Sequence, residues 1–306
     1  MKQFIKLVKR NVKLFFKDKG LFFTSLITPL ILLVLYATFL GNVFQSSYTS
    51  AIPDGVEISN KMINGLVSGQ LFASIIAVSC VTVAFCSNML MVQDKISGVR
   101  KDFLIAPVKQ HVLALSYFVA TFINTLIVCL FASVLCFGYT AMVGWYFSFV
   151  DVLLILCDVV LLTLFGTLLA SIVNSFLTSQ GQISAVGTIV SSVYGFICGA
   201  YMPIATFGKG LQNVLMFLPS TYTTTLIKNH TMNGVLDALL SAGMPEDVLN
   251  GIRQANDLNL SFFGNSVSIG AIYGVLVGTI LLLLGVFILV NFRRQKRHAQ
   301  KLIPVK

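Results

Sequence analysis

Residues 93–109, QDKISGVRKDFLIAPVK, form a short charged segment between two long apolar runs. Gly98 is expected to interrupt a helix here, and Pro107 to end it, because proline lacks an amide hydrogen and disfavours helical backbone in the residue before it. The segment predicts a loop that contacts something in the aqueous phase, with a solvated connector as the alternative. Its apolar residues recur at helical spacing: Ile96, Val99, Phe103 and Leu104.

The rest of the chain is too apolar for a soluble domain. Of its 306 residues, 56% are hydrophobic and 10% are charged, whereas soluble domains carry about a quarter charged residues. The net charge of +10 could indicate nucleic-acid binding. However, the basic residues gather at the chain ends and in the loop, as the positive-inside rule predicts for membrane proteins. We therefore expect a protein of the cell membrane that contacts lipid and no nucleic acid.

Six apolar runs of about 20 residues predict six transmembrane helices, because this length spans the hydrocarbon core of a bilayer. The predicted fold class is an all-α polytopic membrane protein, in which residues 1–306 form a single transmembrane domain. The predicted spans are residues 21–40, 71–92, 112–137, 152–173, 183–200 and 268–290.

Residues 1–19 predict an amphipathic helix before the first span. Lysines repeat at steps of three or four residues, and apolar side chains occupy the other side of the helix. Such a helix is expected to lie in the membrane interface, with its lysines toward anionic headgroups. The lysine stripe consists of Lys2, Lys6, Lys9, Lys13 and Lys17, and the apolar side of Ile5, Val8, Val12, Phe15 and Phe16.

Residues 202–266 predict an extracellular re-entrant hairpin followed by a helical segment. The chain breaks at Met202-Pro203 and returns through an apolar stretch that is too short to span a bilayer. Residues 228–259 are polar enough to lie in water. Within them, Pro245 followed by two acidic residues favours the start of a helix.

Two stretches resemble a known family. The order Asp94-Lys95, Gly98-Val99, residues 101–104 and residues 106–108 resembles the first cytoplasmic loop of type-2 ATP-binding-cassette (ABC) exporter permeases. A glycine-rich fifth span, then Met202-Pro203, then a short helix ending at residues 218–221 resembles the drug-exporter branch of that family. The resemblance covers nearly the whole chain.

This resemblance implies a coupling helix in residues 93–110 that sits in a cleft of a separate ABC ATPase subunit. It also implies a second permease copy or a paralogue, with ATP and Mg²⁺ bound by the ATPase and no cofactor in this chain. Phe103 would be the buried anchor of the contact, beside Val99 and Leu104. The residues expected to contact the ATPase are Asp94, Gly98, Val99, Asp102, Phe103, Leu104 and Pro107.

The basic residues predict the orientation of the chain. Of 21 lysines and arginines, 17 lie in the first nineteen residues, in the loop or in the C-terminal tail. Six spans place both termini on one side, and the positive-inside rule assigns that side and the loop to the cytoplasm.

The sequence contains no catalytic motif. The three histidines are scattered, with His111 and His230 assigned to loops, and no phosphate-binding G-x-x-x-x-G-K-[ST] motif is present. The six cysteines lie in apolar segments without metal-ligand spacing, so we expect packing roles for them. The chain is therefore predicted not to be an enzyme.

Asp158 is the one ionisable residue predicted to lie deep within a span. A carboxylate in lipid is costly, by about 2.5–3.5 kcal/mol on insertion scales, so Asp158 is expected to face protein or a water-filled path. It could line a substrate path, or it could be a hydrogen-bonded acid that helps helices to pack. The second role is the more common one.

Two stripes of small residues predict close helix contacts, because small side chains allow backbones to approach. Either stripe could pack within the chain, and the other could then form a dimer contact. They are Gly187, Ser191, Gly195 and Gly199 in the fifth span, and Gly270, Gly274 and Gly278 in the sixth.

Together these features predict the permease half of an ATP-driven exporter of a drug-like, lipid or peptide substrate. An ABC exporter of a polysaccharide is one alternative. Another is a secondary transporter driven by an ion gradient, which would require several charges within the membrane. The remaining alternatives, a membrane enzyme and a purely structural protein, have no supporting motif in the sequence.

Overall fold

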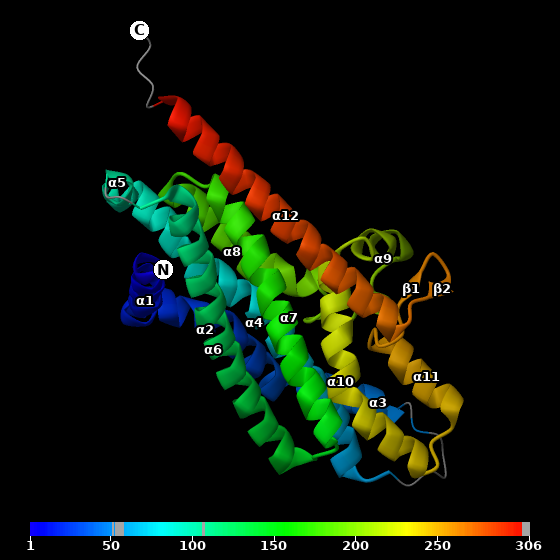
Figure 1. The fold of residues 1–306 in the computed structure, drawn as a ribbon. Helices are drawn as coiled ribbons and strands as arrows, with labels where there is room; N and C mark the ends of the chain where they lie inside the picture. The colour runs from blue at the N-terminus through cyan, green and yellow to red at the C-terminus, as the bar shows by residue number, and fades with distance from the viewer. Residues whose placement is uncertain (51, 53–57, 106–107, 302–306) are drawn as a thin grey trace.

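The computed structural model describes residues 1–50, 52, 58–105 and 108–301, and this part of the chain is almost entirely helical (Figure 1). Its only strands, β1 (Ser261–Phe262) and β2 (Asn265–Ser266), form a small antiparallel hairpin. The predicted all-α class is confirmed. The helices are α1 (Lys2–Lys17), α2 (Lys19–Leu35), η1 (Tyr36–Leu40), α3 (Gly41–Ser50), α4 (Asn60–Ile96), α5 (Val99–Ile105), α6 (Gln110–Val143), α7 (Phe149–Phe176), α8 (Gln180–Ile197), η2 (Ile204–Thr206), α9 (Lys209–Leu215), α10 (Pro219–Ser241), α11 (Glu246–Ala255) and α12 (Ile269–Lys301).

Among the described residues, five helical stretches are long and apolar enough to cross a membrane. They are Lys19–Ser50, Asn60–Ile96, Gln110–Val143, Phe149–Phe176 and Ile269–Arg293. The remaining predicted span, the fifth (residues 183–200), corresponds to α8, which has 18 residues. Two glutamines in its first turn and several serines and glycines make α8 less apolar than the other five.

Several helices are longer than the sequence predicted. The first span, predicted to end at Leu40, continues as helix through α3 to Ser50. Between α2 and α3, η1 is a π-helical turn. α4 begins eleven residues before the predicted span, and the basic tail continues the α12 helix to Lys301. Hydropathy locates the apolar centre of a helix, whereas its ends depend on contacts outside that centre.

The helical bundle has two ends. The loop end holds α5, between the last residues of α4 and the first residues of α6, and the distal end holds the α6–α7 turn and the C-terminal end of α10 (Figure 1). Three long helices, α4, α6 and α7, run between these two ends.

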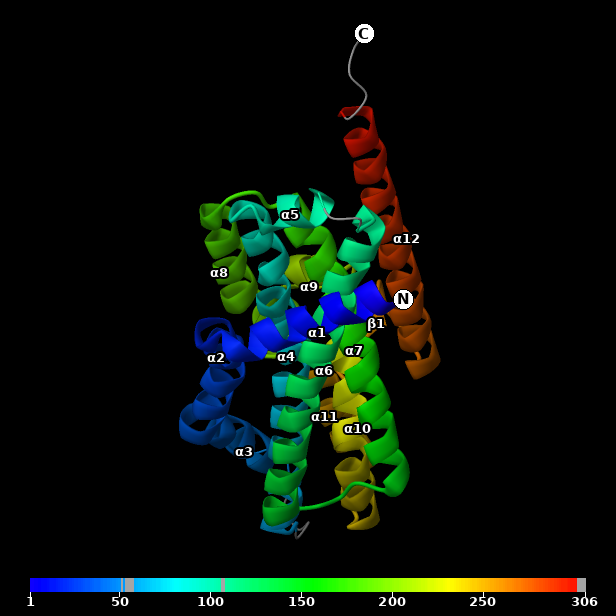
Figure 2. The same cartoon turned by 60° about the vertical axis from the view of Figure 1, so that its left-hand side comes forward.

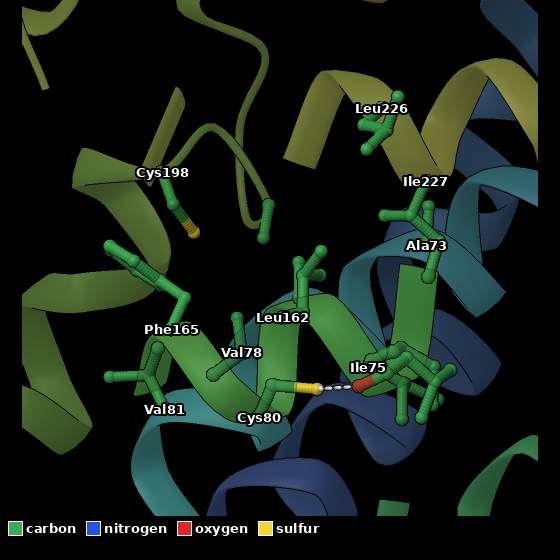
Figure 3. Packing of buried hydrophobic residues seen from close by; sticks show 14 of the residues in the cluster. Ala73, Ile75, Val78, Cys80, Val81, Leu162, Phe165, Cys198, Leu226 and Ile227 are labelled. Carbon is green, nitrogen blue, oxygen red and sulfur yellow. Dashed lines mark hydrogen bonds between the residues drawn. The ribbon is translucent and has the colours of Figure 1, made fainter. Parts of the chain in front are cut away.

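α4 is the centre of the bundle. In the most apolar 18-residue stretch of α4, 89% of the residues are buried. The helix packs against α2, α6, α7, α8 and α10. α7 approaches it closely at Gly166, where a Cβ atom would overlap the carbonyl oxygen of Cys80. Figure 3 shows side chains of both helices at this contact, including Val81, Leu162 and Phe165.

α10 contradicts the expectation that residues 228–259 lie in water. Every residue from Ser220 to Met232 is buried, and the helix packs against α4, α7 and α12. Pro219 occupies the first position of α10, where its missing amide hydrogen costs nothing. Residues 218–221, where a short helix was predicted to end, are therefore where α10 begins. Hydroxyls satisfy much of its polarity within the helix; for example, Thr231 donates to the carbonyl of Ile227 at 2.9 Å.

A second, smaller core lies at the distal end. It joins α3, the first turns of α4, the second half of α10 and α11 around apolar side chains such as Leu66, Leu236 and Leu249. Gly69 of α4 faces α10 so closely that a Cβ atom would lie 2.5 Å from the carbonyl oxygen of Thr231. α10 therefore connects the main core to this distal core.

The exposed apolar surface fits a protein surrounded by lipid. In the most apolar 18-residue stretch of α12, only 17% of the residues are buried. This helix packs mainly on α7 and α10. Large apolar side chains are exposed along three of the candidate spans: Leu30, Ile31 and Val34 on α2, Phe131 and Val134 on α6, and Leu281 and Leu282 on α12.

Candidate functional site

The short helix α5 is the centre of the candidate site. α4 ends at Ile96, and Gly98 then adopts a left-handed backbone (φ 88°), which redirects the chain into α5. Because this conformation strains residues that have a Cβ atom, glycine suits the position. The predicted helix break at Gly98 is confirmed. Pro107 and the side chain of Leu104 lie outside the described residues.

Asp94, in the last turn of α4, anchors this site to α1. Arg10 donates from Nη1 to Oδ2 of Asp94 at 2.6 Å and from Nη2 to Oδ1 at 3.0 Å, which is a bidentate ion pair. The hydroxyl of Tyr117 on α6 donates to Oδ2 of the same carboxylate at 2.5 Å. The hydrogen bond to Asp94 raises the pKa of the Arg10 guanidinium. Three helices, α1, α4 and α6, therefore meet at one carboxylate.

Phe103 of α5 packs inside the chain. Its ring is half-buried against a cluster that contains Leu7, Met91 and Leu113, and the guanidinium carbon of Arg10 lies 5.1 Å from the ring centroid. This placement differs from the expectation that Phe103 would project into a partner. The ring and the guanidinium form a cation–π contact that attaches α5 to α1.

Other residues of the loop face outward. Ile96 is 43% exposed and Asp102 is exposed, while Val99 is half-buried. On the inner side, Nζ of Lys95 donates to the backbone carbonyl of Leu177 at 2.5 Å, just after α7 ends. Lysine at this position also suits the negative end of the helix dipole. The loop is thus attached to α7 as well as to α1.

α1 lies across α6 (Figure 2). The five predicted lysines are exposed, and the buried face is Leu7, Asn11 and Phe15. Two residues assigned to the apolar side, Ile5 and Phe16, are exposed at 57% and 39%. α1 therefore packs on α6 through a narrow stripe of buried side chains, and other apolar side chains of α1 remain exposed.

Asp158 is fully buried and both of its carboxylate oxygens have partners. Oδ2 lies 2.6 Å from Nδ1 of His230 on α10, and Oδ1 accepts a hydrogen bond of 3.1 Å from the hydroxyl of Tyr273 on α12. The expectation that His230 lies in a loop is wrong, because α10 is a helix inside the bundle. Asp158 therefore joins α7, α10 and α12 through hydrogen bonds.

Comparison with known protein families identifies the family of this chain. The family model of the ABC-2 type transporter matches residues 2–229, which is most of the chain. The chain belongs to the ABC-2 type transporter family. None of the curated proteins matches it. The match covers α1, the α5 loop and α7, whereas His230 and Tyr273, the partners of Asp158, lie beyond its last residue.

This ABC-2 transporter chain contains a second buried ion pair that hydropathy did not reveal. Nζ of Lys228 is fully buried and donates to the backbone carbonyls of Gly199 at 2.9 Å and Asn256 at 3.1 Å, and it lies 3.4 Å from Oδ2 of Asp257. Asp257 also accepts hydrogen bonds from the backbone amides of Ile204 and Ala205. Through these contacts, the pair of Lys228 and Asp257 attaches α10 to the end of α8, to the predicted re-entrant hairpin at residues 204–205 and to the residues after α11.

The two small-residue stripes differ in their contacts. In the fifth span, a Cβ atom at Gly195 would overlap the ring of Tyr201, and one at Gly187 would lie 2.9 Å from Cε of Met89. Gly199 has a φ of 73°, and Ser191 donates to the carbonyl of Gly187. By contrast, Cβ atoms at Gly270, Gly274 and Gly278 would meet no described atom within 4 Å.

A metal site would need several metal-binding side chains close together in the part of the chain that the structure describes. No group of three His, Cys, Asp or Glu side chains there is placed to hold a metal ion. Five of the six cysteines are buried, as packing residues would be, and Cys157 is exposed. The family membership instead makes the chain a membrane transport component of the permease type.

Proposed function

We propose that this chain is the membrane half of an ATP-driven exporter and works with a separate ABC ATPase subunit through α5. One observation carries the proposal: α5 directly follows the last turn of α4, in which Asp94 bonds to Arg10 of α1 and Tyr117 of α6, and Lys95 bonds to the end of α7. A force applied to α5 would pass through this turn to α1, α6 and α7 together. A solvated connector would not need these attachments.

The outward residues Ile96 and Asp102 supply the proposed ATPase contact, and Phe103 positions α5 from the inner side. ATP and Mg²⁺ would be bound by the partner, not by this chain. The loop and both termini would face the cytoplasm, because 17 of the 21 basic residues lie in these parts.

Two copies, or one copy and a paralogue, would form the transport path between them. The stripe Gly270, Gly274 and Gly278 supports a dimer contact, since no described atom of the same chain occupies the space beside it. A drug-like, lipid or peptide substrate fits the apolar composition, with multidrug efflux as the expected activity and a polysaccharide as the alternative.

Cysteine cross-linking tests the proposed contact. The chain would be expressed without its native cysteines, carrying Ile96→Cys or Asp102→Cys, together with the ABC ATPase that co-purifies with it or is encoded beside it. Both positions should cross-link to the ATPase, and ATP should drive transport in proteoliposomes. Glu246→Cys, on α11, is the control and should not cross-link. Transport that persists without any ATPase would contradict the proposal.

A transporter driven by a proton gradient is the second candidate. The sequence argued against it because only Asp158 was expected inside the membrane. However, the structure also buries His230, Lys228 and Asp257. Transport that follows an imposed pH gradient in vesicles containing this chain alone would favour this candidate over the ATP-driven exporter.

A further inference from the structure

A large cavity lies between the first span and residues 202–206 of the predicted re-entrant hairpin. Two of the helices that line it, α3 and α11, lie away from α5 (Figure 1). Its volume is about 840 Å³, which falls within the range of about 300–1,000 Å³ that is typical of small-molecule sites. One wall comes from the segment Leu35 to Tyr48, and the opposite wall comes from the end of α8, the hairpin and α11. Elements far apart in the sequence therefore enclose one space.

The lining is apolar and carries no charge. Aromatic and aliphatic side chains such as Phe39, Val43 and Phe196 form the walls. The polar groups at the floor satisfy one another, because the hydroxyl of Tyr48 donates to Oδ1 of Asn256 at 2.8 Å. Such a cavity offers no partner for an ion. A charged ligand would lose its hydration without an opposite charge to compensate it, and the aromatic rings would compensate a cation only in part.

Two local features create the space. On one side, the π-helical turn η1 inserts extra backbone at Tyr36–Leu40, and π-turns of this kind are frequently found at functional sites. On the other side, Gly251 and Ala255 stand one helical turn apart on α11, and both line the cavity. Their small side chains leave room that larger residues would fill.

The cavity is reachable from the surface. Phe39 and Phe196, on opposite walls, are 62% and 48% exposed, and Met202 at the hairpin is 42% exposed. An apolar molecule could therefore enter without unfolding an element. Burial in this lining would stabilise it in proportion to the apolar area removed from water.

We infer that this cavity binds an uncharged, largely apolar small molecule, and that such molecules are the substrate class of the transporter. The second clause rests on the proposed export function, whereas the binding itself does not. Absence of charge selects against cations and anions alike, and the exposed hydroxyl of Ser47 offers a hydrogen bond to a neutral polar group.

Photoaffinity labelling of the purified full chain tests the inference without ATP or the ATPase. The probe is a neutral long-chain alcohol that carries a diazirine, and the comparison probes have the same chain ending in a carboxylate or a trimethylammonium group. We expect the neutral probe to label peptides from α3 and α11 most strongly. Equal labelling by all three probes would overturn the inference.

Gly251→Leu is the matched variant. A Cβ atom at Gly251 meets nothing within 4 Å, and leucine favours a helix more than glycine does, so the fold should be kept. Filling the cavity should weaken labelling by the neutral probe about tenfold, since the leucine takes the apolar space that the probe would occupy. Gly210→Leu, the same change on α9 outside the cavity, should leave labelling unchanged. A thermal unfolding curve confirms that both variants are folded.

Two further outcomes would overturn the inference by showing a different occupant. If Gly251→Leu abolishes dimers but leaves labelling unchanged, a second copy of the chain fills the cavity. If added phospholipid displaces the neutral probe completely, a bilayer lipid occupies it. ATP-dependent transport by the wild-type chain with its ATPase is measured separately, so failure of this inference is distinguishable from failure of the proposed function.

Discussion

The carboxylate of Asp158 on α7 lies 2.6 Å from Nδ1 of His230 on α10, although the two residues are 72 positions apart in the sequence. Both side chains are buried, and Tyr273 of α12 completes the group. Three helices that are otherwise joined by apolar packing therefore share one hydrogen-bonded cluster. Its role can be tested by removing one partner at a time.

His230→Leu should destabilise the protein by about 3–5 kcal/mol, because it leaves a buried carboxylate without its nearest partner. Asp158→Asn should cost less, since the amide can still bond to both neighbours. The double variant Asp158→Leu with His230→Leu should recover part of the loss. Thermal unfolding of the purified chain measures these differences. A larger loss for Asp158→Asn than for His230→Leu would argue against this view of the pair.

Asp158→Asn also tests whether this residue lines a substrate path. If it does, transport should change while expression and assembly remain near normal. Transport at the wild-type level would exclude the path role and leave a packing role.

Arg10→Lys should reduce the coupling of ATP hydrolysis to transport. Lysine cannot reproduce the bidentate contact with Asp94 or lie flat over Phe103, so α5 would be held less firmly. We expect hydrolysis to continue with less substrate moved per ATP in proteoliposomes. Arg253→Lys, the same change on α11, is the control. An unchanged ratio in the Arg10 variant would show that this attachment does not transmit force.

Gly166→Ala should destabilise the contact between α4 and α7. The added methyl group would overlap the carbonyl oxygen of Cys80, and overpacking of this kind costs about 1–3 kcal/mol. Gly138→Ala on α6 is the control, because a Cβ atom there meets no described atom within 4 Å. Thermal unfolding should show a loss only for Gly166→Ala, and equal stability of the two variants would disprove the close contact.

Lys228→Met should destabilise the distal half by about 3–5 kcal/mol, because it leaves Asp257 buried without its cation. It also removes hydrogen bonds to the carbonyls of Gly199 and Asn256. Amide hydrogen exchange should increase in the predicted re-entrant hairpin after α8 and in α11 before it increases in α4. The exposed Lys209→Met on α9 serves as the control, and no change in exchange at the hairpin would contradict the assigned role.

Accessibility to an impermeant thiol reagent tests the orientation. In a chain without native cysteines, Glu246→Cys should react in intact cells, whereas Asp102→Cys should react only after permeabilisation. Both side chains are exposed, so access to solvent is not limiting. Reaction of Asp102→Cys from outside would reverse the proposed orientation.

The sequence alone determined the features that depend on local chemistry. Runs of apolar residues fixed the fold class and the centres of the long helices, since length and hydropathy are properties of the segment itself. The break at Gly98 also followed from the sequence, because its cause is the backbone freedom of one residue. The predicted exposure of the five lysines of α1 rests on the same kind of local periodicity.

Only the tertiary structure decided the position of polar residues inside the bundle. Hydropathy placed the part of α10 from Lys228 onward in water, because residues such as Lys228, Asn229 and His230 are polar, but these side chains find partners inside the bundle. Lys228 is 29 positions from Asp257, and no local pattern encodes that pairing. The same reason applies to Phe103, whose ring faces inward because Arg10 of α1 lies over it. A buried polar group is stabilised only by its partners, and the fold, rather than the segment, brings those partners together.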